Sequence, residues 1–239
     1  NDLNQEAVDE VVAAGGKGAT QAAIGENCDI IITILPNGSL VKSVVFGENG
    51  VASKIKPASL VSDMSSVTAT ESHECADGLA KKGVKFLDAP VSGGEPGAIN
   101  GTLAIMVGGE QEDFDRMKPY FDILGKSAVL IGPTGSGSIT KLVNQAIVNL
   151  NIATVSEAFV LAAKAGADPE KVYQAICGGL AGSQVMHDKI PMIINRNFKP
   201  GGKISINHKD IKNVLATAHE LDVPMPLTAQ LFEIQQAIK

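Results

Sequence analysis

The pattern of apolar and polar positions changes near residue 132 of this chain. Before that point, nearly continuous apolar runs alternate with stretches of helical periodicity. Continuous runs are typical of strands buried on both faces of a sheet; here they lie at 30–35, 59–64, 84–88, 103–107 and 128–131. The helical patterns lie at 5–14, 40–46, 69–82 and 112–124. Such alternation predicts a doubly wound α/β sheet with helices on both faces, as in a Rossmann-type domain.

After that point the pattern is helical throughout. The stretch from Ser138 to Ala165 is rich in Ala, Val, Ile, Leu and Asn, has no proline, and ends at Gly166, a residue that commonly stops a helix. Four further helical patterns start near Asp168-Pro169, Ser183, Lys209 and Pro226. We therefore predict an α/β domain at residues 1–134 and an all-α domain at 135–239, with a long helix between them.

Composition and charge narrow the function classes. The chain has 239 residues, 44% of them hydrophobic, with a net charge of −6 and no tryptophan. An acidic chain with few aromatic residues argues against a nucleic-acid partner. No apolar run approaches the ~20 residues that cross a bilayer, and no secretory signal is present, so we expect a cytoplasmic protein with no membrane partner. Three cysteines and four histidines show no metal-ligand spacing, which predicts free structural thiols and no metal site.

Two glycine-rich segments carry the candidate chemistry. In the first, the strand at 84–88 runs into Ser92-Gly93-Gly94, and such a turn can aim a hydroxyl and backbone N–H groups at an anion. An ordinary turn after a strand is the alternative. In the second, Gly135-Ser136-Gly137 opens the long helix, which carries Lys141 near its start. A lysine there can place a mobile proton over a bound carbonyl.

Lys141 belongs to a stripe on one face of the long helix, formed with Asn144, Gln145 and Val148 at spacings of three, four and seven residues. Spacing alone also permits a solvated helix face. Leu35-Pro36 ends one predicted strand and Ser65-Ser66 follows another, and both pairs are common in ordinary loops. The segment His208-Lys209-Asp210 can likewise be a helix cap with a solvated charge cluster.

The two glycine-rich segments resemble those of the β-hydroxyacid dehydrogenases, the family that includes 3-hydroxyisobutyrate dehydrogenase. Three further stretches support the resemblance, which covers nearly the whole chain: DAPVSGGEPGAINGT (88–102), GGLAGS (178–183) and RNFKPG (196–201). It implies an NAD(P)-dependent enzyme whose helical domain serves substrate binding or oligomerisation. It also implies a homodimer or homotetramer.

The resemblance assigns roles to individual residues. Lys141 matches the catalytic lysine, and Asn144 the substrate-binding asparagine, while the family more often has asparagine where Gln145 stands. The substrate carboxylate would lie on Ser92, Gly93 and Gly94, with Gln145 also at the substrate. The cofactor residues would be Leu35 and Pro36 near the adenosine half, Ser66 near the nicotinamide, and Lys209 with its supporting partner Asp210; His208 has no carried-over role.

The start of the chain differs from a complete nucleotide-binding domain. Such a domain begins with a strand, a G-x-G-x-x-G turn and a helix, and an acidic residue about 20 residues later binds the ribose. The 239 residues contain no such glycine motif, and Asp2 stands where the acidic residue would be. We expect both domains to be incomplete at the chain's outer ends, and we expect NAD(H) to be preferred, with NADP(H) as the alternative.

The function that the resemblance implies is reduction of a small carboxylate-bearing aldehyde, tartronate semialdehyde, to glycerate, with the proton coming from Lys141. Oxidation of 3-hydroxyisobutyrate or another small β-hydroxyacid is the alternative within the class. A 6-phosphogluconate-type substrate is disfavoured because the chain has only two arginines, Arg116 and Arg196, to grip a phosphate. The alternative from another class is a non-catalytic interaction protein that has lost its cofactor site.

Overall fold

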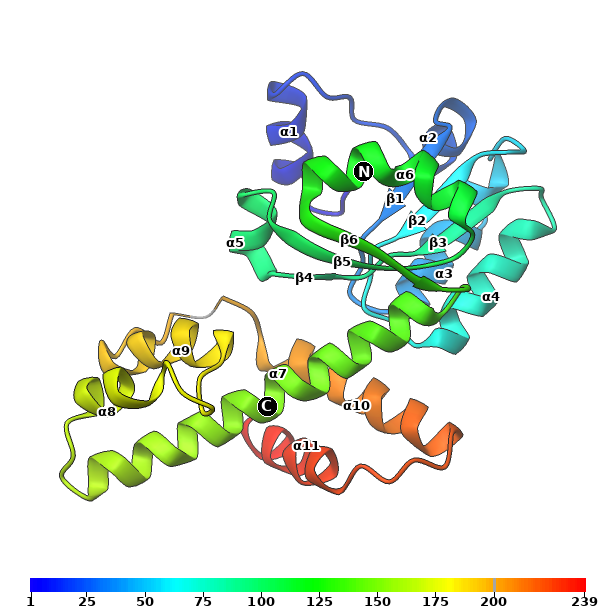
Figure 1. Ribbon diagram of the computed structural model, residues 1–239. Coiled ribbons are helices and arrows are strands. Elements are labelled where there is room, and N and C mark those ends of the chain that lie inside the picture. Colours follow the sequence, from blue (N-terminus) through cyan, green and yellow to red (C-terminus); the bar gives the residue numbers. More distant parts are fainter. Residues whose placement is uncertain (200) are drawn as a thin grey trace. The chain divides into compact units, whose positions relative to one another are not determined.

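The computed structural model describes residues 1–199 and 201–239. They form two compact units, residues 1–141 and 142–239. The long helix α7 (Ser136–Lys164) begins in the first unit and continues through the second (Figure 1). The boundary between the two compact units therefore falls inside α7, whereas the sequence pattern predicts a domain boundary at the turn before this helix.

A six-stranded sheet forms the centre of the first unit. Three parallel strands come first, β1 (Ile30–Thr33), β2 (Leu60–Asp63) and β3 (Lys85–Asp88). Strand β5 (Leu103–Gly108) pairs antiparallel with both β3 and the short β4 (Val91–Ser92). Strand β6 (Gly125–Gly132) is parallel to β5. The strand order is β1-β2-β3-β5-β4, with β6 also on β5.

The doubly wound sheet expected from the sequence is confirmed, and it is mixed, because β5 runs antiparallel to β3 and β4. A parallel partner needs a crossover of about a dozen residues or more. Strands β4 and β5 are joined only by 93–102, which holds the six-residue helix α5 (Gly94–Ile99). So short a connection turns the chain back antiparallel. Between β5 and β6 the 14-residue helix α6 (Gln111–Leu124) allows a full crossover, and that pair is parallel.

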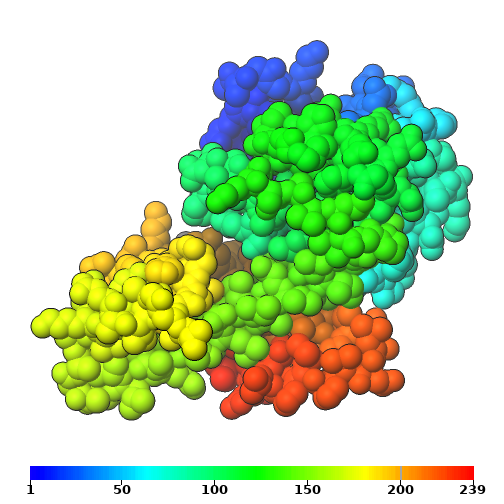
Figure 2. Space-filling model, in the orientation of Figure 1, coloured from blue at the N-terminus to red at the C-terminus, as the bar shows by residue number. Residues whose placement is uncertain are grey.

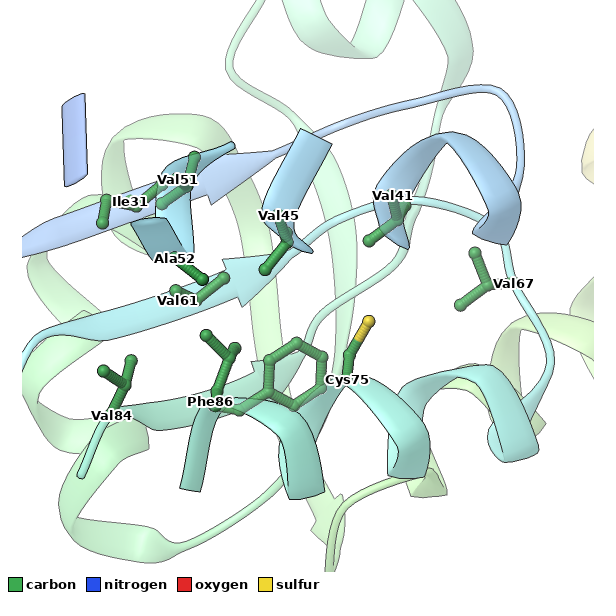
Figure 3. Close-up of a cluster of buried hydrophobic side chains, with 11 residues drawn as sticks. Ile31, Val41, Val45, Val51, Ala52, Val61, Val67, Cys75, Val84 and Phe86 are labelled. Atoms are coloured by element: carbon green, nitrogen blue, oxygen red, sulfur yellow. The ribbon is translucent and has the colours of Figure 1, made fainter. Parts of the chain in front are cut away.

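Helices cover both faces of the sheet, as predicted. On one face, buried side chains of α3 (Gly38–Phe46), the 3₁₀ turn η1 (Val51–Ser53) and α4 (Ala69–Ala80) pack with those of β1–β3 (Figure 3). On the other, α6 packs Phe114, Met117 and Phe121 against β2, β3 and β5. Figure 2 shows the outer surface of α6 in green. Helices α1 (Gln5–Ala13) and α2 (Gln21–Asn27) precede β1.

Neighbouring strand residues serve opposite faces because side chains alternate along a strand. Val61 and Phe86 lie in the core under α3 and α4, whereas Leu60 and Leu87 lie in the core under α6. Cys75 belongs to the first of these cores (Figure 3), and burial raises the pKa of its thiol to about 11. Such a thiol stays protonated and acts as a packing residue.

The second unit is all helical, as predicted. Helices α8 (Pro169–Ile176) and α9 (Gln184–Ile194) pack on Val155 and Phe159 of α7. Helix α10 (Ile204–Glu220) contributes Val214 to a smaller core with Leu142 and Ala146 of α7, and α11 (Pro226–Ile238) follows it.

The sequence pattern missed α2 and α5, which have seven and six residues and too few turns for a clear periodicity. It also placed the start of α10 near Lys209, five residues late. The segment 196–201 used for the family resemblance includes Pro200, which lies outside the described residues.

Helix α7 is the one helix in the described part of the chain with the length and apolar composition of a membrane-crossing segment. It is not an uninterrupted apolar run, because Lys141, Asn144, Gln145 and Asn149 lie within it. One such helix is weak evidence for a membrane, since long interior helices of other proteins meet the same criteria.

Candidate active site

Asp88 joins the two glycine-rich segments that the sequence singled out. It is the last residue of β3, four residues before Ser92, and it is fully buried. Its two carboxylate oxygens accept hydrogen bonds from the backbone N–H groups of Gly135 and Ser138, each at 2.7 Å. These N–H groups lie at the start of α7, where the helix has no backbone acceptors of its own. One side chain therefore fixes the beginning of α7 to the strand that leads into the Ser-Gly-Gly turn.

Gly137 allows the start of α7 to approach the sheet closely. A Cβ atom at this position would lie 2.4 Å from the carbonyl oxygen of Met106 and 2.6 Å from that of Asp88. Any larger residue would push the helix away from β3 and β5. Ser138 continues the same contact, because it is fully buried and its hydroxyl lies 2.9 Å from the hydroxyl of Ser72 on α4. Close packing of α7 on the sheet therefore requires a glycine at this position of the turn.

The Ser-Gly-Gly turn has the open backbone that an anion cradle needs. Ser92 is half-buried at the end of β4, while Gly93 and Gly94 are exposed. Gly93 has φ 134° and Gly94 has φ 60°, both in the region that favours glycine. A Cβ atom on Gly93 would also lie 3.2 Å from Leu103. Only glycine therefore keeps this turn and leaves its N–H groups accessible.

Lys141 lies on α7 three residues after Ser138, and its side chain is buried, with 7% of its surface exposed. Gln145, one turn later, is 8% exposed. These values exclude the solvated helix face that spacing alone permitted. A lysine in an interior position is held in few orientations, as a group that acts on one bound atom must be.

Burial determines the electrostatics around Asp88. Desolvation raises the pKa of Asp88, and the hydrogen bonds from Gly135 and Ser138 partly oppose that rise. Asp63, its register partner on β2, is also buried, and desolvation likewise raises its pKa. Two carboxyl groups therefore lie side by side at the carboxyl ends of adjacent parallel strands.

Asp63 organises the loops in which two cofactor residues were expected. Its Oδ1 accepts hydrogen bonds from the hydroxyls of Thr33, at 2.8 Å, and Ser65, at 2.5 Å. The Ser65 hydroxyl in turn accepts the backbone N–H of Leu35 at 2.8 Å. The loops after β1 and β2, with Leu35-Pro36 and Ser66, are thereby held together at the carboxyl edge of the sheet, where open α/β sheets bind ligands.

A second group of expected site residues meets within the helical unit. The Asn144 amide nitrogen donates to Gln145 Oε1 at 2.9 Å, and Gln145 Nε2 donates to Asp210 Oδ2 at 2.6 Å. Asp210 Oδ1 lies 2.7 Å from the ammonium nitrogen of Lys209. Neighbouring His208 is buried and stacks on Phe232, with ring centroids 4.3 Å apart.

Asp2 is exposed near the start of α1. Its Oδ1 accepts the backbone N–H of Asn4 at 2.8 Å, and Asn4 caps α1. This geometry leaves the rest of the carboxylate exposed to solvent, and its role at a ribose stays a prediction.

Sequence reasoning missed the residues that hold the site together: Thr33, Asp63, Ser65, Ser72 and the carboxylate role of Asp88. A usable signal was present, since Asp63 and Asp88 each end an apolar strand, and a charge in such a place is costly unless hydrogen-bonded. Two surface hollows of the first unit, about 420 and 320 Å³, lie elsewhere, at the β1–α6 edge and beside Gly135; neither is lined by Ser92 or Lys141.

Both parts of the chain match sequence models of known protein families. Residues 1–132 match the sequence model described as the NAD binding domain of 6-phosphogluconate dehydrogenase. Residues 135–239 match the model described as NAD-binding of NADP-dependent 3-hydroxyisobutyrate dehydrogenase. The two matches meet at the turn that opens α7.

Individual relatives point to the same family as the sequence models. The chain is 42% identical over 227 residues to 2-hydroxy-3-oxopropionate reductase of Escherichia coli, covering 95% of this chain and 78% of the relative. It is 37% identical to 2-(hydroxymethyl)glutarate dehydrogenase of Eubacterium barkeri, covering 97% and 79%. A solved 3-hydroxyisobutyrate dehydrogenase from Salmonella typhimurium superposes with a TM-score of 0.88 at 29% identity, covering 99% and 83%. The chain belongs to the β-hydroxyacid dehydrogenase family of NAD(P)-dependent oxidoreductases.

Proposed function

We propose that this enzyme reduces 2-hydroxy-3-oxopropanoate (tartronate semialdehyde) to glycerate. The observation that carries the proposal is the Asp88 contact, which ties the Ser92-Gly93-Gly94 turn and the start of the Lys141 helix to one buried carboxylate. A carboxylate cradle and a proton donor, held by the same structural element, suit an aldehyde that also bears a carboxylate. The non-catalytic alternative is not retained, because the chain belongs to an enzyme family.

Each site residue would have one task. The Ser92 hydroxyl and the accessible N–H groups of Gly93 and Gly94 bind the substrate carboxylate, which orients the aldehyde carbon. Lys141 donates a proton to the carbonyl oxygen as negative charge develops there. Asn144 would bind a second polar group of the substrate.

The residues of the first unit fit a nicotinamide dinucleotide, because Leu35-Pro36 and Ser66 lie on loops joined at the carboxyl edge of the sheet. The reduced nicotinamide supplies the hydride when it is bound. Leu35 and Pro36 would contact the adenosine half, Ser66 would lie near the nicotinamide, and Lys209, held by Asp210, would serve the cofactor side of the helical unit.

Sequence identity favours this substrate over the alternatives. The 2-hydroxy-3-oxopropionate reductase is 42% identical to this chain, and the 2-(hydroxymethyl)glutarate dehydrogenase is 37% identical. A phosphorylated substrate is disfavoured by Arg116, whose guanidinium donates to the backbone carbonyls of Ala58, at 2.8 Å, and Asp29, at 3.1 Å. That arginine is engaged in holding loops of the fold.

Steady-state kinetics on the full-length enzyme test the proposal. We expect kcat/KM for reduction of 2-hydroxy-3-oxopropanoate to exceed kcat/KM for oxidation of 3-hydroxyisobutyrate, measured with both NAD and NADP forms of the cofactor. A higher value for 3-hydroxyisobutyrate would overturn the substrate assignment and leave the family unchanged.

Ser92→Ala is expected to raise KM for the aldehyde about tenfold with little change in kcat. The lost hydrogen bond to a charged group is worth about 1.5–3 kcal/mol. It contacts a group that does not react, so it contributes similarly to the ground and transition states. Substrate titration measures the effect, with Ser127→Ala, an exposed serine on β6, as the matched control. An unchanged KM would make Ser92 a turn residue only.

NADH is expected to be preferred over NADPH, because the exposed Asp2 carboxylate would repel a 2′-phosphate. One charge pair at ~4 Å is worth ~4 kcal/mol at an effective dielectric of ~20, and solvent screening reduces this greatly. A remaining ~1.4 kcal/mol gives a tenfold preference. Asp2→Asn removes the charge and keeps an oxygen for the Asn4 N–H, so it should narrow the ratio of kcat/KM values. Asp9→Asn on α1 is the control, and an unchanged ratio in Asp2→Asn would show that Asp2 does not face the ribose.

A further inference from the structure

A side chain fixes the backbone just beyond the end of β1. Past the paired residues of β1 and β2, the Met64 N–H donates to the Thr33 carbonyl at 2.7 Å. Two residues later, the Leu35 N–H donates to the Ser65 hydroxyl at 2.8 Å. The next residue, Pro36, has no N–H to donate. The Ser65 hydroxyl therefore holds the chain at the point where it leaves the sheet.

The Ser65 hydroxyl has its orientation from a buried carboxylate. Asp63 Oδ1 accepts three hydrogen bonds, from the Thr33 hydroxyl at 2.8 Å, the Ser65 hydroxyl at 2.5 Å and the Ser65 backbone N–H at 3.2 Å. A serine hydroxyl has one proton to donate and two lone pairs that accept. Because the proton of Ser65 goes to Asp63, its lone pairs are left for the Leu35 N–H.

This contact orders an exposed loop from below. Ser65 is 1% exposed, so it does not itself reach a molecule bound at the surface. Leu35 is half-buried and packs its side chain on the core under α3 and α4, whereas Pro36 is exposed. The backbone N–H and the side chain of Leu35 are thus both held, and the proline ring restricts the backbone that follows. The loop has its conformation before any ligand binds.

We propose that Ser65 is a positioning residue for the cofactor, because it holds the Leu35-Pro36 loop in the conformation that binds the adenosine half of the dinucleotide. This inference rests on the proposed function for the place of the cofactor, and it does not depend on the identity of the substrate. A site that is already ordered binds its ligand more tightly, since binding does not have to order it. Release of the loop should therefore weaken cofactor binding and leave the chemical step unchanged.

Ser65→Ala in the full-length enzyme removes the acceptor of the Leu35 N–H. We expect the Kd for NADH, measured by fluorescence titration, to rise about tenfold, which corresponds to one hydrogen bond of ~1.4 kcal/mol. ADP-ribose, which lacks the nicotinamide, should lose affinity by the same factor in competition with NADH, because Leu35 and Pro36 serve the adenosine half. At saturating NADH, kcat and the KM for the aldehyde should stay close to the wild-type values.

Two matched variants separate this role from a general loss of stability. Ser62→Ala removes the hydroxyl of another buried serine, on β2, which has no hydrogen-bond partner among the described residues. It should leave both Kd values unchanged. Thr33→Val removes a hydrogen bond to Asp63 and keeps the contact between Ser65 and Leu35. It should lower the unfolding temperature, as Ser65→Ala does, with Kd values close to those of the wild type.

Two further measurements keep the test decisive. Ser65→Cys keeps a weaker acceptor, so it should raise the Kd for NADH less than Ser65→Ala, and it replaces that variant if Ser65→Ala does not fold. Amide hydrogen exchange of the cofactor-free enzyme needs no ligand. The Leu35 amide should exchange roughly tenfold faster in Ser65→Ala than in the wild type, because its hydrogen bond no longer has to open.

The outcomes separate this inference from the proposed function. Unchanged Kd values in a folded Ser65→Ala enzyme, or an equal rise in Thr33→Val, would overturn the role of Ser65. A loss of affinity for NADH without a loss for ADP-ribose would overturn the link to the adenosine half. A wild-type enzyme that binds NADH and does not reduce 2-hydroxy-3-oxopropanoate would refute the proposed substrate and leave the role of Ser65 in place.

Discussion

Lys141→Ala in the full-length enzyme is expected to lower kcat about 10²–10⁴-fold, the usual contribution of a positioned proton donor. Affinity for NADH, measured by fluorescence titration, should stay close to the wild-type value, because the proposed role of Lys141 is at the substrate carbonyl. The side chain is buried and lies three residues after Ser138, whose backbone N–H donates to Asp88.

Two further variants make this result interpretable. Lys164→Ala removes an exposed lysine from the other end of the same helix and should leave kcat unchanged. Lys141→Arg retains the positive charge, yet guanidinium does not give up a proton at neutral pH. If Lys141→Arg keeps more than a tenth of the wild-type kcat, Lys141 acts by charge alone; if Lys141→Ala does so, Lys141 is not the proton donor.

Asp88→Ala is expected to lower the free energy of unfolding by about 2 kcal/mol and kcat at least tenfold. Two buried N–H groups lose their acceptor, at about 1–3 kcal/mol each, and relief of the buried charge offsets part of this. The loss of kcat follows because a shift of about 1 Å in catalytic geometry can cost 10²-fold in rate. Asp88→Asn, which keeps one acceptor, should show a smaller loss of stability. Denaturant unfolding and steady-state kinetics measure both effects.

The control for Asp88 is Asp113→Ala on α6. Asp113 is also buried, at 5% exposed, and burial raises its pKa as well, but it does not bind the start of α7. It should leave kcat near the wild-type value. An Asp88→Ala enzyme with wild-type kcat would contradict the proposal that this carboxylate positions Lys141.

The stability difference at Asp88 should also depend on pH. Burial raises the pKa of this carboxyl above its ordinary value of 3.8, so the folded protein holds a proton that the unfolded chain has released. The corresponding stability is fully present below pH 3.8 and is lost as the pH rises through the raised pKa. The gap in unfolding free energy between wild type and Asp88→Asn should therefore widen in acid; a gap that narrows there would contradict the assigned direction.

The sequence by itself determined the order of the longer helices and strands, because the period of the apolar pattern differs between strand and helix. The predicted bounds of β1–β3 and β5 lie within one or two residues of the observed ones. The predicted start of α7 differs by two residues from the observed start, and its predicted end differs by one. The sequence also singled out Ser92-Gly93-Gly94 and Lys141, because glycine clusters beside a strand end or a helix start are visible locally.

Only the tertiary structure decided how these pieces meet. Strand direction was not encoded in the apolar runs, and the short connection between β4 and β5 made the sheet mixed. No local pattern showed that Asp88 caps a helix 47 residues away, that Asp63 joins two loops, or that Gln145 links Asn144 to Asp210. These are hydrogen bonds between residues far apart in sequence, and their acceptors are buried carboxylates whose partners are chosen by packing, since an interior charge must be satisfied by whatever donors the fold brings to it.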